Sequence, residues 1–284
     1  MLLLMGEVFF IPIVGAEQTL YVTVSIPPQA YFVKRIGGEY VTVTVMVPSG
    51  SDPHSFEPKP QQLVNLKGSR IYFAIGVTFE DAWLDRFRSV NPDMRVVFTD
   101  RDIEKSPMTE DSQSGGKTAH TGTSDPHIWL SPPLAMMQAR TIYTTLIDID
   151  PMRREYYSAQ YKVLIKEITD LDCELSAYFH RQNGNNTFIV SHPAWGYFAR
   201  AYGLEQVPIE IEGKEPKPAD LARLITFARE HNIRAVFVQP QFSSKSARTI
   251  ADAIKGQVIV ADPMAENWLE NLKNVAEKLK PALR

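Results

Sequence analysis

The sequence predicts an α/β protein of two similar lobes, each with a parallel four-stranded sheet, joined by one long backbone helix. In the first and last parts of the chain, short β-branched runs alternate with helix-like segments, which is typical of parallel sheets covered by helices. A long segment without strand signals separates these two parts. The length of 284 residues suits roughly two domains.

The N-terminal lobe is predicted to contain four strands and at least two helices. Its strands are the runs rich in β-branched residues, Tyr21–Ile26, Tyr40–Val47, Arg70–Ile75 and Arg95–Phe98. Helices are predicted between them, over Pro60–Lys67 and Glu80–Arg88. The stretch Glu104–Ser124 that follows is rich in Ser, Thr and Gly, which is typical of a mobile loop.

A single long helix is predicted over Pro151–Gln182, which contains no Gly and no Pro after its first residue. Apolar residues recur there at spacings of three and four, as on one face of a helix. Asp150 is a good capping residue, and Pro151 suits the first turn. At 1.5 Å per residue the helix would be roughly 48 Å long. We therefore expect it to run along both lobes, to join them and to limit their opening about a hinge.

The C-terminal lobe repeats the alternation of strands and helices. Strands are predicted over Thr187–Val190, Gln206–Ile211, Arg234–Val238 and Gln257–Val260. Helices are predicted over Pro218–His231, Ser244–Lys255 and Asn267–Leu279. The chain is thus divided into a signal-like segment (1–18), an N-terminal lobe (19–149), a linking helix (150–183) and a C-terminal lobe (184–284).

The composition excludes several classes of protein. Lys and Arg number 30 and Asp and Glu number 33, so the net charge of -3 argues against a nucleic-acid partner. Cys173 is the single cysteine, which excludes disulfides within the chain and sites that need two thiolates. A metal site would therefore use carboxylates and some of the six His residues.

The N-terminus favours a secretory signal. Leu2–Ala16 is apolar except for Glu7 and is too short to cross a bilayer, which takes about 20 residues. Small residues at Val14–Ala16 suit a cleavage point. The first basic residue is Lys34, so a buried N-terminal strand or helix is the alternative. No other segment is apolar over the length of a membrane span. We therefore expect a periplasmic or other extracytoplasmic protein that is soluble once processed.

Four polar residues stand out as a candidate site: His54, His127, His192 and Asp262. His192 and Asp262 directly follow predicted strands, where open α/β sheets bind their ligands. Taken singly, each residue has an ordinary explanation, such as a cap or a turn. Their spacing matches no short zinc motif, so the intervals alone are a weak signal.

Ordered sequence blocks from about Tyr21 to Leu279 carry a more specific signal. They are Ser51-Asp52-Pro53-His54, Phe56-Glu57-Pro58, Asp125-Pro126-His127-Ile128-Trp129, Ser191-His192-Pro193-Ala194-Trp195, Glu212-Gly213-Lys214-Glu215-Pro216, Phe237-Val238-Gln239-Pro240-Gln241-Phe242 and Asp262-Pro263-Met264. With these blocks the chain resembles the periplasmic zinc- and manganese-binding proteins of ABC metal importers, the cluster A-I or ZnuA-TroA-like solute-binding family. The fold of that family, two α/β lobes joined by a long helix, agrees with the pattern described above.

The resemblance implies a monomeric solute-binding protein that captures a divalent metal between its lobes. It also implies delivery of the ion to the permease and ATPase of an ABC importer, without enzymatic activity. Carried over residue by residue, the implied metal ligands are His54 and His127 from the N-terminal lobe and His192 and Asp262 from the C-terminal lobe.

The implied ligand set favours zinc. Three imidazoles and one carboxylate suit tetrahedral Zn²⁺, whereas Mn²⁺ prefers more oxygen ligands. Manganese-selective relatives usually have Glu where this chain has His192. Manganese is kept as the alternative, because mixed-metal relatives share the present set. Many zinc-binding members carry a His-rich run in the loop between the first two ligands, but Glu104–Ser124 contains only His120, which we expect to be solvated.

Supporting roles are predicted for a few neighbours. Gln239 and Glu210 are candidates for orienting the ligands, or else ordinary polar residues at strand ends. Trp129 and Trp195 are expected to pack in the core or to shield the site from water.

Two other classes of function stay open. Three His residues with a metal-bound water would make a zinc hydrolase, with Asp262 as the base. Four protein ligands would close the site and argue against it. A surface adhesin or structural α/β protein would bind no stoichiometric metal.

Overall fold

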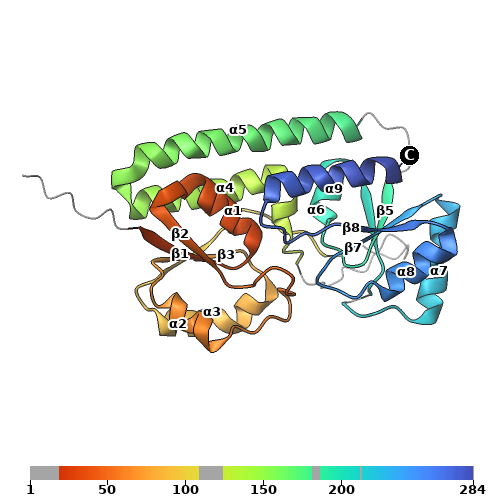
Figure 1. Ribbon diagram of the computed structural model, residues 1–284, viewed down its shortest axis with the longest axis horizontal. Helices are drawn as coiled ribbons and strands as arrows, with labels where there is room; N and C mark the ends of the chain where they lie inside the picture. The colour runs from red at the N-terminus through yellow and green to blue at the C-terminus, as the bar shows by residue number, and fades with distance from the viewer. Residues whose placement is uncertain (1–18, 109–123, 181–185, 212, 284) are drawn as a thin grey trace, which may run out of the picture.

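The computed structural model describes residues 19–108, 124–180, 186–211 and 213–283. The predicted signal-like segment 1–18 lies outside these residues, as do His120 and most of the predicted loop around it. The described chain forms two α/β lobes that lie side by side beneath a shared layer of helices (Figure 1). The predicted fold class is therefore confirmed.

The N-terminal lobe contains a parallel four-stranded sheet in the order β2-β1-β3-β4. Its strands are β1 (Leu20–Val24), β2 (Val41–Val45), β3 (Ile71–Ala74) and β4 (Arg95–Phe98). Every residue of β3 is buried, as expected for a central strand covered on both faces. All four strands were predicted from the sequence; the structure shortens β2 and β3 at both ends, and β1 begins one residue earlier and ends two residues earlier than predicted.

The C-terminal sheet repeats this order as β6-β5-β7-β8, again with every pair parallel. Its strands are β5 (Thr187–Val190), β6 (Glu205–Pro208), β7 (Ala235–Val238) and β8 (Gln257–Val260). The strand order reverses between β1 and β3, and between β5 and β7. Ligands of open α/β sheets bind beyond the carboxyl ends of the strands at such points.

Helices connect the strands in both lobes. The N-terminal lobe has α1 (Pro27–Gly37), α2 (Pro60–Leu66) and α3 (Thr78–Val90); the C-terminal lobe has α6 (Gly196–Ala201), α7 (Pro218–Glu230), α8 (Lys245–Ile254) and α9 (Trp268–Ala282). The sequence analysis missed α1 and α6. The start of α1 has prolines in its first turn, and the chain leaves the helix at Gly38 with a φ of 54°.

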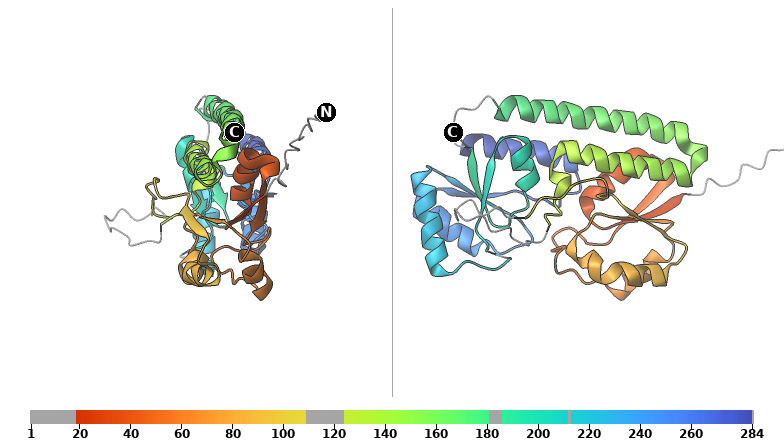
Figure 2. Two further views of the ribbon diagram at one scale, coloured as in Figure 1. Left: turned by 90° about the vertical axis from the view of Figure 1, so that its left-hand side faces the viewer. Right: turned by 180° about the vertical axis from the view of Figure 1, so that it is seen from behind.

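A pair of long helices follows the N-terminal sheet. They are α4 (Pro132–Ile149) and α5 (Arg154–Phe179), with a 3-10 turn at Pro151–Arg153 between them. The predicted helix at Pro151–Gln182 thus begins as a 3-10 turn and continues as α5. Figure 1 and the right-hand view of Figure 2 show α5 extending from one lobe over the other, above α4 and α9. This arrangement confirms a long helix that joins the lobes.

The two lobes are also tied together by a pair of tryptophans. Trp268, at the start of α9, donates its indole N–H to the backbone oxygen of Trp129 at 2.5 Å. Trp129 in turn donates to the backbone oxygen of Pro263 at 2.7 Å. The ring of Trp268 packs against Phe32 of α1, with centroids 5.1 Å apart. The chain that follows β8 is therefore held against the N-terminal lobe.

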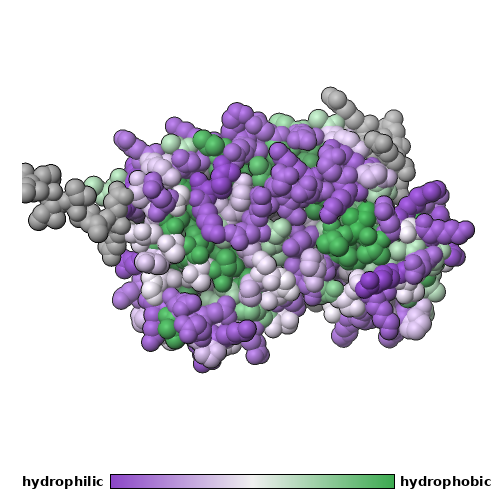
Figure 3. All heavy atoms as spheres, in the orientation of Figure 1, coloured by the Kyte–Doolittle hydropathy of each residue, from purple (hydrophilic) through white to green (hydrophobic). Residues whose placement is uncertain are grey.

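The surface was searched for membrane-spanning helices and for apolar areas. Among the described residues, none of the helices is both long and apolar enough to cross a membrane. Apolar side chains gather over the regions of β1–β2 and of β7–β8 (Figure 3). Val260, on the edge strand β8, is 51% exposed. Its carbonyl oxygen accepts a hydrogen bond from Nζ of Lys278 at 2.7 Å.

Candidate metal centre

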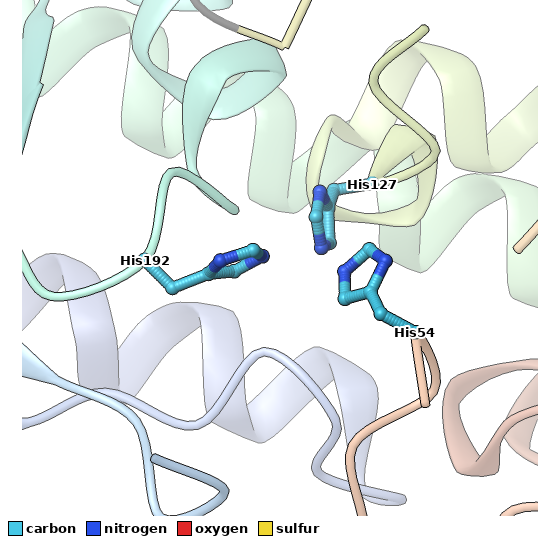
Figure 4. Close-up of side chains that lie close together, drawn as sticks. All are labelled: His54, His127 and His192. Carbon is cyan, nitrogen blue, oxygen red and sulfur yellow. The ribbon is translucent and has the colours of Figure 1, made fainter. Parts of the chain in front are cut away.

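Three histidines from distant parts of the sequence meet between the lobes. His54, His127 and His192 each offer one ring nitrogen, and these atoms all lie within 4.8 Å of one another. The ring centroids are 5.1 to 5.5 Å apart. Figure 4 shows the three rings turned toward one another from three separate loops. Within the described residues, no other group of three or more metal-binding side chains was found.

Each imidazole is supplied by a loop with a defined local structure. His54 lies in the proline-rich loop after β2, where its backbone N–H donates to Oδ1 of Asp52 at 2.9 Å. His127 directly precedes the 3-10 turn Ile128–Leu130, and its backbone N–H donates to Asp125 at 2.9 Å. His192 comes two residues after β5. The fold thus brings together the loops at the carboxyl ends of the strands.

The Nδ1 atom of every imidazole has its own hydrogen-bond partner. Nδ1 of His127 lies 2.7 Å from Oδ1 of Asp125, and Nδ1 of His192 lies 2.6 Å from Oε1 of Glu210. Nδ1 of His54 lies 3.2 Å from Oγ1 of Thr78. A carboxylate only accepts hydrogen bonds, so Nδ1 of His127 and of His192 must carry the proton. Nε2 then keeps its lone pair, which is the tautomer that a metal requires.

The Nε2 atoms of His54 and His192 are buried and have no hydrogen-bond partner within the described structure. A buried ring nitrogen without a partner is unfavourable, because it has lost its bond to water. A divalent cation at the point where the three rings meet would supply that partner. The residues therefore fit a metal ion chemically.

Burial and mutual repulsion keep two of the imidazoles neutral. The pKa of His54 is lowered to about 4, mainly by burial and further by the nearby His127 and His192. The pKa of His127 is lowered by burial, although the Asp125 carboxylate opposes the shift. Neutral imidazoles bind metals and protonated ones do not, so the fold prepares these two ligands for an ion.

Two carboxylates balance the charge that an ion would bring. Asp125 is fully buried, and the side chain of Glu210 is only 17% exposed. Together they provide two negative charges directly behind two of the imidazoles. Three neutral imidazoles and a divalent ion would thus be compensated without any charge from a fourth ligand.

The loop after β7 fixes the position of His192. The Gln239 side chain accepts the backbone N–H of His192 at 3.1 Å and donates to its carbonyl oxygen at 2.8 Å. The Phe242 ring packs on the imidazole, with centroids 4.8 Å apart. A small cavity adjoins the rings, lined by Pro53, His54, His127, His192, Gln241, Phe242, Pro263 and Met264.

Asp262, the fourth residue singled out in the sequence, does not belong to the group of three. It lies in the loop after β8, next to Pro263 and Met264 of the cavity wall. Its Oδ1 accepts hydrogen bonds from Nε2 of Gln241 at 2.8 Å and from the backbone N–H of Met264 at 2.9 Å. The structure therefore brings Asp262 to the rim of the site with its carboxylate engaged elsewhere.

Some of the supporting residues were found from the sequence and others were missed. Glu210 and Gln239 contact His192 as expected. Trp129 is fully buried, and its ring lies 5.2 Å from that of His127. Asp125, Thr78 and Gln241 were missed. For Asp125 the signal was its place two residues before His127, because Asp often bonds the backbone two residues on.

The chain is similar to known proteins of metal uptake. A family model described as ZnuA, zinc-uptake complex component A, periplasmic, matches residues 22–282. The high-affinity zinc uptake system protein ZnuA of Bacillus subtilis is 31% identical over 252 residues, which cover 86% of this chain and 78% of that protein. The manganese-binding lipoprotein MntA of Halalkalibacterium halodurans is 28% identical over 226 residues, which cover 77% of this chain and 70% of that protein.

Solved structures show the same fold. A crystal structure of ZnuA superimposes with a TM-score of 0.87 at 42% identity, covering 94% of this chain and all of that one. A ZnuA variant lacking residues 138 to 173, with zinc bound, gives a TM-score of 0.85 at 41% identity, covering 94% of this chain and 98% of that one. The similarity therefore extends over both lobes and the linking helix.

Proposed function

Because the chain belongs to the family of the periplasmic component A of zinc-uptake complexes, we propose that it captures Zn²⁺ outside the cytoplasm and delivers it to an ABC importer. One observation carries the proposal. Ring nitrogens of His54, His127 and His192 converge within 4.8 Å, and two of the Nε2 atoms are buried without partners. A cation is the partner that such a group of nitrogens lacks.

We assign His54, His127 and His192 as the primary metal ligands and Asp262 as the fourth. The lobes at 19–149 and 184–284 would each contribute two ligands, with the linking segment 150–183 between them. Asp262 would have to move its carboxylate toward the imidazoles, because Gln241 and Met264 now donate to it. The charges of Asp125 and Glu210 support binding through the first three ligands before that movement.

Zinc is the ion that this set of donors suits best. Imidazole-rich tetrahedral sites are typical of zinc, whereas Mn²⁺ prefers oxygen ligands. Zinc uptake and manganese binding both occur among the named relatives, so manganese is the alternative outcome of a metal analysis. The proposal includes export by an N-terminal signal, action as a monomer, and docking to a permease driven by an ATPase. It assigns no catalytic residue.

The experiment is a metal analysis of purified protein, followed by calorimetric titration of the metal-free form. We expect one Zn²⁺ per chain. His192→Ala should lower the zinc affinity by orders of magnitude while the circular dichroism spectrum is retained. His180→Ala is the matched control, because His180 is exposed at the end of α5 and does not belong to the group of three histidines. Absence of stoichiometric metal, or unchanged affinity in His192→Ala, would contradict the proposal.

A further inference from the structure

Gln241 and Asp262 form a contact that bears on the choice of metal. Nε2 of Gln241 donates to Oδ1 of Asp262 at 2.8 Å. The orientation of the amide follows from chemistry, because a carboxylate oxygen accepts hydrogen bonds and cannot donate them. The same Oδ1 accepts the backbone N–H of Met264 at 2.9 Å. Two donors therefore hold the carboxylate outside the group of imidazoles.

The other end of the Gln241 amide faces an unfavourable environment. Its Oε1 is buried and has no hydrogen-bond partner within the described residues. Gln241 also lines the cavity beside the three imidazoles. An apolar side chain of similar size would avoid the loss of a hydrogen bond at this position. The feature that an apolar residue could not reproduce is the hydrogen bond from Nε2 to Asp262.

The loop that carries Gln241 is held firmly in relation to the site. Gln239 makes two hydrogen bonds to the backbone of His192. Phe242 packs on the His192 ring, and its backbone N–H donates to the carbonyl oxygen of Gln239 at 3.3 Å. Gln241 lies between these two residues, so the backbone from which its amide extends is fixed beside the site. A movement of the carboxylate toward the imidazoles stretches this hydrogen bond, and an ion that binds through Oδ1 replaces it, because Oδ1 already accepts two hydrogen bonds.

The loss of that hydrogen bond affects different metals unequally. The carboxylates of Asp125 and Glu210 already compensate a divalent ion, and three imidazoles are a sufficient nitrogen set for Zn²⁺. Mn²⁺ binds imidazole more weakly and prefers oxygen ligands. Gln241 therefore lowers the affinity for an ion that depends on the Asp262 oxygen more than the affinity for an ion that depends on the imidazoles.

We propose that Gln241 is a selectivity-determining residue, whose amide competes with the bound ion for Asp262 and so disfavours Mn²⁺ relative to Zn²⁺. The inference rests on the proposed function, because it concerns the same metal site. Gln241 acts through Asp262 and does not itself touch the ion.

The test is a double-mutant cycle with Gln241→Leu and Asp262→Ala in the metal-free full chain. Dissociation constants for Zn²⁺ and Mn²⁺ are measured by competition with a chromophoric chelator. Gln241→Leu should tighten Mn²⁺ binding about tenfold or more, the effect of losing one competing hydrogen bond to a charged group, and Zn²⁺ binding by less. In the Asp262→Ala background, Gln241→Leu should change neither constant.

Several outcomes would overturn the inference. One is a ratio of Zn²⁺ to Mn²⁺ affinity that Gln241→Leu leaves unchanged. Another is a gain in Mn²⁺ affinity that persists in the Asp262→Ala background. The third is weaker binding of both ions in Gln241→Leu, which would show that Gln241 supports Asp262 as a ligand. Gln241→Asn serves as a second variant, because its shorter amide also releases Asp262 and keeps a polar side chain. Gln61→Leu is the matched control, since Gln61 is exposed on α2 and its side-chain amide donates to Asn65 on the same helix.

The measurements on the unmodified chain separate the two proposals. If it binds neither ion stoichiometrically, the proposed function itself fails. If it binds Zn²⁺ tightly and the variants leave the affinity ratio unchanged, only the role of Gln241 fails.

Discussion

Glu210 and His192 are joined by a hydrogen bond of 2.6 Å between Oε1 of the carboxylate and Nδ1 of the imidazole. The carboxylate comes from the chain after β6 and the imidazole from the chain after β5, which are neighbouring strands. The bond fixes the tautomer of His192 and directs its ring toward His54 and His127 (Figure 4). Glu210 thus contributes both orientation and negative charge to the proposed metal site.

Glu210→Gln should lower the zinc affinity about 10- to 100-fold, because it removes a charge and weakens the bond that orients His192. The measurement is competition titration with a zinc chelator, with the circular dichroism spectrum as a check on folding. Glu205→Gln is the control, since Glu205 is exposed at the start of β6. Equal affinities in the two variants would show that the carboxylate of Glu210 does not support the ion.

Glu80 should make the metal-free protein less stable as the pH rises from about 4.5 to 7. Burial raises the pKa of Glu80 to about 7, against hydrogen bonds from Ser25 and from the backbone of Ile75 and Gly76 that favour the charged form. The folded state therefore binds the proton more tightly than the unfolded chain. This stabilisation is complete below the unfolded pKa and is lost as the pH rises through the folded one.

Glu80→Gln should remove this loss of stability with rising pH, which we expect to reach about 2–3 kcal/mol between pH 4.5 and 7. The measurement is urea unfolding of the metal-free chain at several pH values, and the comparison is the difference between the two proteins. Glu270→Gln, an exposed change in the first turn of α9, should leave the slope in place. A difference between Glu80→Gln and the unmodified chain that stays constant with pH would refute the expectation.

His54 should have the opposite effect, so that its contribution to stability falls as the pH falls from about 6.5 to 4. Its pKa in the folded protein is about 4, below the usual value of 6.5. Between these two pH values the unfolded chain binds a proton on this imidazole and the folded protein does not. This contribution to stability is complete above about pH 6.5 and is lost as the pH falls toward 4. Unfolding of His54→Gln should show a shallower loss of stability over that range. His180→Gln is the control, and an equal loss in both variants would contradict the prediction.

Trp268→Phe should destabilise the protein by about 1–3 kcal/mol, because it leaves the buried carbonyl oxygen of Trp129 without its indole donor. Reduced packing against Phe32 adds to the cost. Thermal and urea unfolding measure the effect. Trp83→Phe, at a half-buried position on α3, provides the comparison. A larger loss in Trp83→Phe than in Trp268→Phe would show that the contact between lobes contributes little.

The regular elements of the fold could largely be predicted from local patterns. All eight predicted strands are observed, since β-branched runs between turn residues mark buried parallel strands. Helix α1 escaped prediction although Pro27, Pro28 and Gly38 mark its ends. The short helix α6 carries too few residues for a periodic signal, and it directly follows the loop of His192.

The contacts behind the imidazoles could be predicted only in part. Glu210 and Gln239 were identified by their places at strand ends. Thr78 and Gln241 were not, because they reach His54 and Asp262 through side-chain contacts that depend on how separate segments pack within each lobe.

The sequence by itself determined the class of fold, the family resemblance and the loops that carry the candidate ligands. These follow from periodicity and from short ordered blocks, which are local properties of the chain. Only the tertiary structure decided that His54, His127 and His192 meet while the Asp262 carboxylate stays with Gln241. The physical reason is that a shift of one or two ångströms changes the partner of a carboxylate, and such shifts arise from packing across the whole molecule.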